Sequence, residues 1–201
     1  TLGLSLGTLF TAGAVFAVGL GFAMQNIAQN FVSGVILLAE RAIKQGDILR
    51  FDGDIVEVRS LGIRSTIVRN RDGLDLIVPN SAIVQSTVSN YTLNDSSYRV
   101  RVTVGVSYAS DLQEVRAALA RACEKMPPGA GPAQIVLADF GSSSVDFEVA
   151  LWTDNPWEER NTLSALRQEI WDELAAADIT IAFPQLDVHF DADSTLHQRS
   201  A

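Results

Sequence analysis

The side chains that most often do chemistry are few in this chain and are not grouped. The two histidines, His189 and His197, both lie near the C-terminus. No His, Cys, Asp or Glu set has the short spacing that metal sites use. The single cysteine, Cys123, falls on the apolar face of a predicted helix, where a free cysteine is more often a core residue than a nucleophile. The sequence therefore predicts no enzyme, no metal site and no cofactor.

Two further motifs also have simpler explanations than chemistry. Gly19 and Gly21 lie inside an apolar run, without the strand, turn and helix that a nucleotide-binding loop requires. Glu158 and Glu159 follow Pro156 at the start of a predicted helix, where acidic side chains complement the helix dipole. Neither motif indicates a ligand site.

The distribution of charge along the chain is uneven. Residues 1–39 contain no Asp, Glu, Lys or Arg, residues 1–107 have a net charge of +1, and residues 108–201 have a net charge of −10. A nucleic-acid groove needs a basic face, so the acidic distal half argues against nucleic acid as a partner.

The uncharged start predicts a membrane helix. Residues 2–24 are apolar apart from Ser and Thr, and at about 1.5 Å per residue they could cross a hydrocarbon core of about 30 Å. The alternative, a signal peptide, needs a basic leading region and a shorter apolar core. No basic residue precedes this stretch.

Small residues are spread along this helix in a way that suits close packing in a membrane. On a helical wheel they occupy two sides, with Ala14, Ala17 and Gly21 on one and Thr11, Val15 and Gly19 on the other. Val18 and Phe22 lie between the two sides. If copies of the helix pack through their small residues, Val18 and Phe22 face the axis of a ring. The alternative, an ordinary contact between two helices, remains open.

A polar patch interrupts the apolar sequence. Residues 25–30 include Gln25, Asn26, Gln29 and Asn30, which would be costly in the bilayer core. We expect the helix to break here and residues 31–39 to lie near the interface. Arg41, Lys44 and Arg50 follow and indicate the cytoplasmic side of the membrane.

Beyond residue 46 the hydrophobic period becomes two, which is typical of strands. Short strands are predicted at residues 47–51, 55–59, 63–69, 74–78 and 88–92. Turns are expected at Asp52-Gly53 and Asp72-Gly73. Five short strands in so few residues favour a small barrel or a curled sheet.

The remaining sequence predicts an α+β unit. Its expected elements are a strand from residue 98, a helix at 111–126, strands at 134–140 and 145–153, a helix at 156–177 and a last strand at 186–190. Ser110 or Asp111 is the expected N-cap of the first helix. This order is that of a ferredoxin-like unit.

Four motifs, in order and at suitable spacing, resemble the small-conductance mechanosensitive ion channels. They are VGLGFAMQNIAQNFVSG at residues 18–34, ERAIKQGD at 40–47, RDG with IVPN at 71–80, and VGVSY at 104–108. The resemblance covers essentially the whole chain. It implies a pore-lining helix with a kink and interfacial segment at residues 1–44, an Sm-like small β barrel at 45–94, a ferredoxin-like cytoplasmic domain at 95–184, and a C-terminal strand and tail at 185–201.

The resemblance also implies a function and site residues. The family implies a homoheptameric ring in the inner membrane, with its C-terminal domains in the cytoplasm, that opens under tension and releases ions and small solutes on hypo-osmotic shock. Its partners would be membrane lipid and other copies of the chain. Val18 and Phe22 match the family's pore gate, Gln25 and Gly34 match a kink residue and a hinge glycine, and Arg41 and Lys44 mark the membrane interface.

The chain departs from the family pattern at three positions. Asn26 stands where some members have a kink glycine, Ala42 where many have proline, and Val15 where alanine is often packed. These changes bear on the kink position and gating threshold and leave the fold unaffected. For Gly34, simple close packing is an open alternative to a hinge.

Two other function classes remain open at this point. A membrane-anchored sensor would use the helix only as a tether, which would not need the polar patch at residues 25–30. A soluble enzyme or RNA-binding protein could use the same small domains, but the uncharged start and the acidic distal half argue against it.

Overall fold

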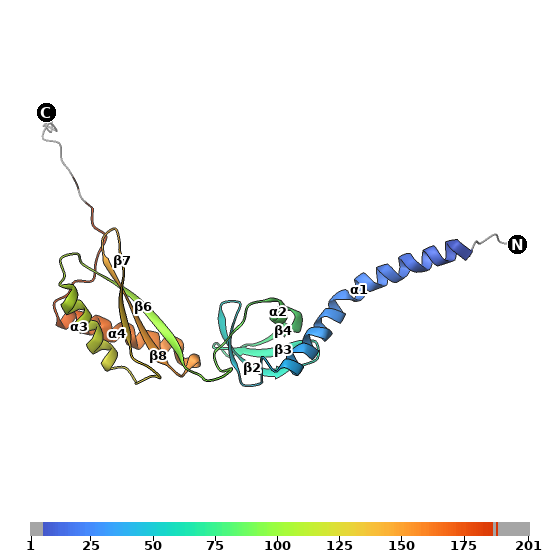
Figure 1. The fold of residues 1–201 in the computed structure, drawn as a ribbon, viewed down its shortest axis with the longest axis horizontal. Helices are drawn as coiled ribbons and strands as arrows, with labels where there is room; N and C mark the ends of the chain where they lie inside the picture. Colours follow the sequence, from blue (N-terminus) through green and yellow to red (C-terminus); the bar gives the residue numbers. More distant parts are fainter. Residues whose placement is uncertain (1–5, 187, 189–201) are drawn as a thin grey trace, which may run out of the picture. The chain divides into compact units, whose positions relative to one another are not determined.

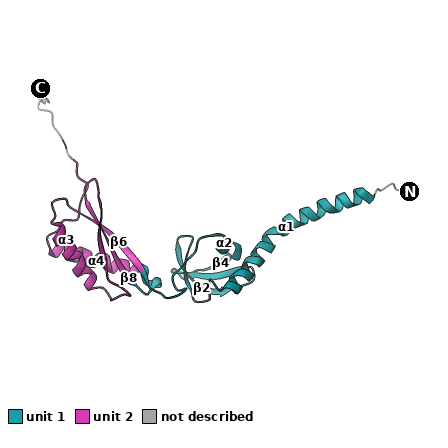
Figure 2. Cartoon of the chain, viewed as in Figure 1, with its two compact units in different colours: residues 1–98, 153–159 teal, residues 99–152, 160–201 magenta. Residues whose placement is uncertain are grey.

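The computed structural model describes residues 6–186 and 188, which divide into two compact units. One unit contains Thr1–Tyr98 and Thr153–Glu159, and the other contains Arg99–Trp152 and Arg160–Ala201 (Figures 1 and 2). The chain therefore leaves the first unit after Tyr98. It returns for residues 153–159 and then continues into the second unit. Each unit has its own sheet.

The first unit begins with one long helix, α1, from Leu6 to Glu40. The predicted break at residues 25–30 is wrong, because α1 remains helical through the polar patch. One polar side chain of the patch bonds within the helix: Asn30 Nδ2 donates to the carbonyl oxygen of Asn26 at 2.9 Å, one helical turn away. The helix ends where Arg41 adopts a left-handed backbone conformation, with φ of 53°.

Five strands follow α1 in an antiparallel sheet. They are β1 (Ile48–Phe51), β2 (Asp54–Leu61), β3 (Ser65–Asn70), β4 (Asp75–Pro79) and β5 (Ser89–Asn90), in the spatial order β4-β3-β2-β1-β5. The predicted strands are confirmed to within a few residues. The Asp52-Gly53 turn has positive φ at both residues, as a two-residue hairpin turn requires.

A short helix that the sequence analysis missed, α2 (Asn80–Gln85), follows β4 directly. It packs against the C-terminal half of α1. Leu37 of α1 and Ile83 of α2 join Leu49, Val58 and Val68 of the sheet in one buried cluster. The C-terminal half of α1 is thus part of the core of the β domain.

The second unit has the predicted ferredoxin-like order. The elements along this part of the chain are β6 (Tyr98–Val106), α3 (Leu112–Glu124), β7 (Gln134–Phe140), β8 (Val145–Thr153), a 3-10 turn (Pro156–Glu158) and α4 (Glu159–Ala176). The 3-10 turn and the terminal residues Tyr98, Thr153 and Glu159 are grouped with the first unit. Asp111 caps α3 through its carboxylate, which accepts from the Gln113 amide at 2.8 Å. The sheet order is β6-β8-β7, and Ile181 forms an isolated bridge beside Val106 where a fourth strand would lie.

The core of this unit lies between its sheet and α3 and α4, as the apolar spacing of the two helices predicts. Phe147 and Val149 of β8 are fully buried, as are Leu119 of α3 and Leu166 and Leu174 of α4. Cys123 is also buried, which confirms its prediction as a core residue, and burial raises the pKa of its thiol.

The predicted last strand, residues 186–190, falls mainly outside the described residues. Leu186 and Val188, the two described members, have no strand conformation.

One carboxylate links the two helices of the second unit. Glu173 of α4 accepts from Arg121 Nε at 2.7 Å and from Lys125 Nζ at 2.8 Å, and both cations belong to the end of α3 or its cap. The hydrogen bond from Lys125, followed by that from Arg121, lowers the pKa of Glu173. The stabilisation is therefore present above the ordinary pKa of a glutamate, about 4.3, and is lost as the pH falls through the lower folded value.

Glu173→Gln should therefore speed amide exchange in α3 and α4 at neutral pH, and the difference from the unaltered chain should disappear in acid. Glu169→Gln is the matched control, because it removes the same charge from α4, at a longer distance of 3.3 Å from Lys125. An effect of Glu173→Gln that stays constant from neutral to acidic pH would contradict the assignment.

Candidate functional site

The first half of α1 is apolar and has nothing packed on it. The helix is long and apolar enough to cross a membrane, and the apolar window that meets this test is not buried by any other part of the described chain. Val18 is 59% exposed and Phe22, one turn further along, is 72% exposed. Exposed apolar surface on this scale marks a membrane or protein interaction site.

The small residues of this half make no contact that explains them within one chain. A Cβ atom added to Gly19 or Gly21 would meet nothing within 4 Å. Ala14 and Ala17 are exposed as well. Their role in helix packing stays a prediction, as does the role of Val18 and Phe22 as a gate.

The second half of α1 is anchored to the β domain by an asparagine. Asn30 Oδ1 accepts hydrogen bonds from the backbone amide of Ser81 at 3.1 Å and from the Ser81 hydroxyl at 2.9 Å. Because Ser81 lies in the first turn of α2, a side chain of α1 satisfies a backbone amide that the short helix leaves free. Asn30 therefore docks α1 onto α2. Gln25 and Asn26, which belong to the same polar patch, are exposed.

One turn further along α1, Gly34 permits a very close approach. A Cβ atom at Gly34 would clash with the carbonyl oxygen of Ile63 and would lie 2.5 Å from Asn80 Nδ2. Gly34 is buried and within the continuous helix. This observation favours close packing for Gly34, and its role as a hinge stays a prediction.

The side chain beneath Gly34, Asn80, has the most complete hydrogen bonding at this junction. It is fully buried, its Nδ2 donates to the carbonyl oxygens of Gly62 and Ile63 at 3.0 Å each, and its Oδ1 accepts from the Thr66 hydroxyl at 2.9 Å. Asn80 thus joins the β2–β3 loop, β3 and α2. In the sequence, Asn80 is singled out only as the last residue of the IVPN motif; its buried hydrogen bonds depend on residues 14 to 18 positions earlier in the chain.

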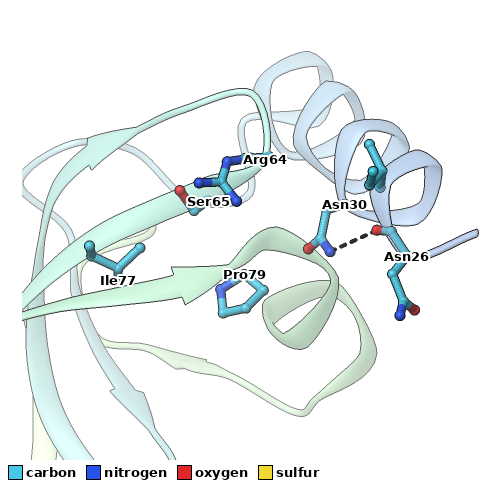
Figure 3. Close-up of a pocket in the computed structure, with 7 residues that line it drawn as sticks. Asn26, Asn30, Arg64, Ser65, Ile77 and Pro79 are labelled. Atoms are coloured by element: carbon cyan, nitrogen blue, oxygen red, sulfur yellow. Dashed lines mark hydrogen bonds between the residues drawn. The ribbon is translucent and has the colours of Figure 1, made fainter. Parts of the chain in front are cut away.

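A cavity of about 290 Å³ opens beside this junction. Figure 3 shows Asn26 and Asn30 on α1 at one side and the residues of β3 and β4 at the other. The lining residues are Asn26, Ile27, Asn30, Arg64, Ser65, Ile77 and Pro79. Its walls are mostly apolar, so the cavity is suited to a hydrophobic occupant and offers no catalytic group.

Arg41 and Lys44 are exposed immediately beyond the end of α1. The backbone amide of Lys44 donates to Asp47 Oδ2 at 2.9 Å, which closes the turn into β1. Both basic residues therefore follow directly after α1 in the chain and are exposed. Their role at a membrane interface stays a prediction.

The described part of the chain contains no group of three or more His, Cys, Asp or Glu side chains able to hold a metal ion. Both histidines lie outside the described residues.

Comparison with known families and structures adds two independent matches. Residues 26–93 match the family described as "Mechanosensitive ion channel, beta-domain", and residues 100–181 match "Mechanosensitive ion channel MscS, C-terminal". The first match begins within α1 and ends shortly after β5, and the second runs from β6 to Ile181.

Individual relatives agree with these matches. The chain is 37% identical to an uncharacterised MscS family protein of Haemophilus influenzae and 35% identical to the mechanosensitive channel MscK of Escherichia coli. These matches cover 97% and 94% of this chain but only 18% and 17% of the relatives, so the chain spans less than a fifth of their length. An MscS family protein of Archaeoglobus fulgidus is 36% identical, with 94% of this chain and 67% of the relative covered.

The fold is also that of a solved channel. The crystal structure of Helicobacter pylori MscS in its closed state superposes with a TM-score of 0.82 at 27% identity, covering 94% of this chain and 76% of that one. With both domain matches and relatives above 30% identity, the chain belongs to the MscS family of mechanosensitive ion channels.

Proposed function

We propose that the complete protein is a channel opened by membrane tension, and that it releases ions and small solutes when the cell meets hypo-osmotic shock. The observation that carries this proposal is α1 itself. Its first half is apolar and exposed at every described position up to Gln29, while its second half is built into the core of the β domain. A simple tether would not need this rigid connection.

A single helix cannot enclose a pore, so the proposal requires several copies of the chain. Copies that pack through Ala14, Ala17, Gly19 and Gly21 would turn Val18 and Phe22 toward a common axis. Two stacked apolar rings would then exclude water when narrow and admit it when tension widens the pore. The family resemblance supports seven copies.

The β domain also presents a surface suited to another copy. β4 is an edge strand of its sheet, and its Leu76 and Ile77 are exposed, as is Ile63 in the β2–β3 loop. An exposed apolar edge is a liability in a monomer and is normally covered. This supports a homo-oligomer in which neighbouring β domains contact one another.

Orientation follows from the charges after α1. Arg41, Lys44 and Arg50 are the first basic residues of the chain, and basic residues close to a span favour the cytoplasmic side. We infer an inner-membrane protein with both compact domains in the cytoplasm and lipid around α1.

The gate assignment predicts that Val18→Asp in the complete protein leaks at rest. Each copy would add a carboxylate to the dry neck, and burying several like charges there is strongly unfavourable. The ring would relieve this by widening and wetting. The measurement is resting conductance and tension threshold in membrane patches, alongside the amount of protein in the membrane.

The matched control is Phe16→Asp, because Phe16 is as exposed as Phe22 but lies on the opposite side of the helix from Val18. This change should reduce membrane insertion without opening the pore. A Val18→Asp protein at normal abundance that stays shut at rest and opens at the ordinary tension would rule out the gate. A protein that never conducts would favour a membrane-anchored sensor.

The close contact between α1 and the β2–β3 loop predicts that Gly34→Ala pushes α1 away from this loop. The added Cβ atom has no room beside Ile63 and Asn80. Overpacking of this kind costs about 1–3 kcal/mol. Thermal unfolding and amide exchange in α2 should both show a less stable junction, even in the closed channel. Gly13→Ala is the control, since a Cβ there meets nothing within 4 Å. Altered gating kinetics with unchanged resting stability would instead show that Gly34 acts as a hinge.

A further inference from the structure

A charged cluster in the first unit connects the β domain to a segment far along the chain. Arg50 of β1 places Nη2 at 2.9 and 3.1 Å from the two carboxylate oxygens of Glu159. Arg71, in the β3–β4 turn, donates from Nη2 to the carbonyl oxygen of Pro156 at 2.7 Å and lies 3.6 Å from Glu159 Oε2. We refer to Arg50, Arg71 and Glu159 as the Arg–Glu latch.

Two tyrosines support the latch. Arg50 Nε donates to the Tyr91 hydroxyl at 2.7 Å, and the Tyr91 and Tyr98 rings meet edge to face at 4.9 Å. The Tyr98 hydroxyl reaches the carbonyl oxygen of Asn155 at 3.5 Å. Burial, followed by the Glu159 carboxylate, raises the pKa of Tyr98, so its phenol is neutral and adds no competing charge. Both arginines thus approach the Glu159 carboxylate.

Two costs oppose the ionic attraction within the latch. Two guanidinium groups share one carboxylate, and the Arg71 and Glu159 side chains are each only 18% exposed. Arg71 Nε is buried without a hydrogen-bond partner in the described structure. The desolvation of these charges and the unmet donor oppose the ionic attraction. A small change in the strength of the ionic attraction therefore changes how firmly the two arginines hold Glu159.

The attraction depends on salt because the Arg50 side chain, 43% exposed, is open to counterions. The screening length falls from about 10 Å at 0.1 M salt to about 3 Å at 1 M. We propose that the latch is a restraint sensitive to ionic strength, which holds the segment Thr153–Glu159, whose last residue begins α4, on the β domain in dilute solution and releases it in concentrated solution.

This inference extends the proposed function. A channel that opens on hypo-osmotic shock meets a cytoplasm that becomes more dilute as water enters and ions leave. The latch would therefore tighten during the response, and the cytoplasmic domain of the channel would respond to ionic strength independently of membrane tension. The competing explanation is a static ion pair that contributes equally under all conditions.

Amide exchange of the purified full-length protein in detergent separates the two explanations. The Glu158 amide, which donates to Asn155 at 3.2 Å, reports on the segment directly. Raising KCl from about 0.05 M to about 0.5 M should speed exchange of this segment about three- to tenfold in the unaltered protein. Glu159→Gln should exchange fast at both concentrations. Arg50→Gln should do the same, which covers the case in which one variant folds poorly.

Glu169→Gln is the charge-matched control, because Glu169 pairs with Lys125 in the other unit. It should keep the salt dependence of the unaltered protein. Exchange that does not depend on salt in the unaltered protein, or equal salt dependence in Glu159→Gln, would overturn the latch.

A second readout separates failure of the latch from failure of the proposed function. In excised patches with the cytoplasmic side facing the bath, the open lifetime should vary with bath KCl in the unaltered channel and not in Glu159→Gln. A channel that opens normally, with the same salt dependence in both proteins, would overturn the latch alone. Salt-dependent exchange in a protein that never conducts would support the latch and overturn the proposed function.

Discussion

The buried amide of Asn80 is the contact on which the arrangement of the first unit depends. Its hydrogen bonds hold the Gly62–Ile63 backbone and Thr66 together at the start of α2. Because all of these bonds lie in a buried site, losing any one of them would leave a buried polar group without a partner. Gly34 rests directly on this amide, so the path of α1 out of the β domain is set by a site that holds together three parts of the chain.

This constraint explains why the polar patch of α1 does not break the helix. Asn30 bonds the first turn of α2, and Leu37 fills the core of the β domain. The helix is therefore held at its C-terminal half by specific contacts, while no other part of the described chain buries the apolar window of its first half. A rigid, anchored helix can transmit a displacement between a membrane and a folded domain, whereas a flexible tether cannot.

The sequence predicted most of the fold because its signals are local. Period-two patterns and two Asp-Gly turns located the strands, and Asp111 located the start of α3. The helix break was wrong because the partners of Asn30 lie about fifty residues further along the chain, beyond any local pattern. The short α2 was missed because six residues are too few to show a helical period. For the same reason the sequence could suggest Val18 and Phe22, which share a face of one helix, but could not reveal Asn80 or the contacts of Arg71, which depend on tertiary packing.

The central claim is that anchored copies of α1 line a common pore. The measurement that tests it most directly is an end-on structure of the complete protein in a lipid bilayer. The account predicts a ring of copies, seven by family resemblance, with Val18 and Phe22 converging on the axis and Asn30 bonded to Ser81 in every copy. Copies of α1 held apart by lipid, with Val18 and Phe22 facing acyl chains, would contradict it.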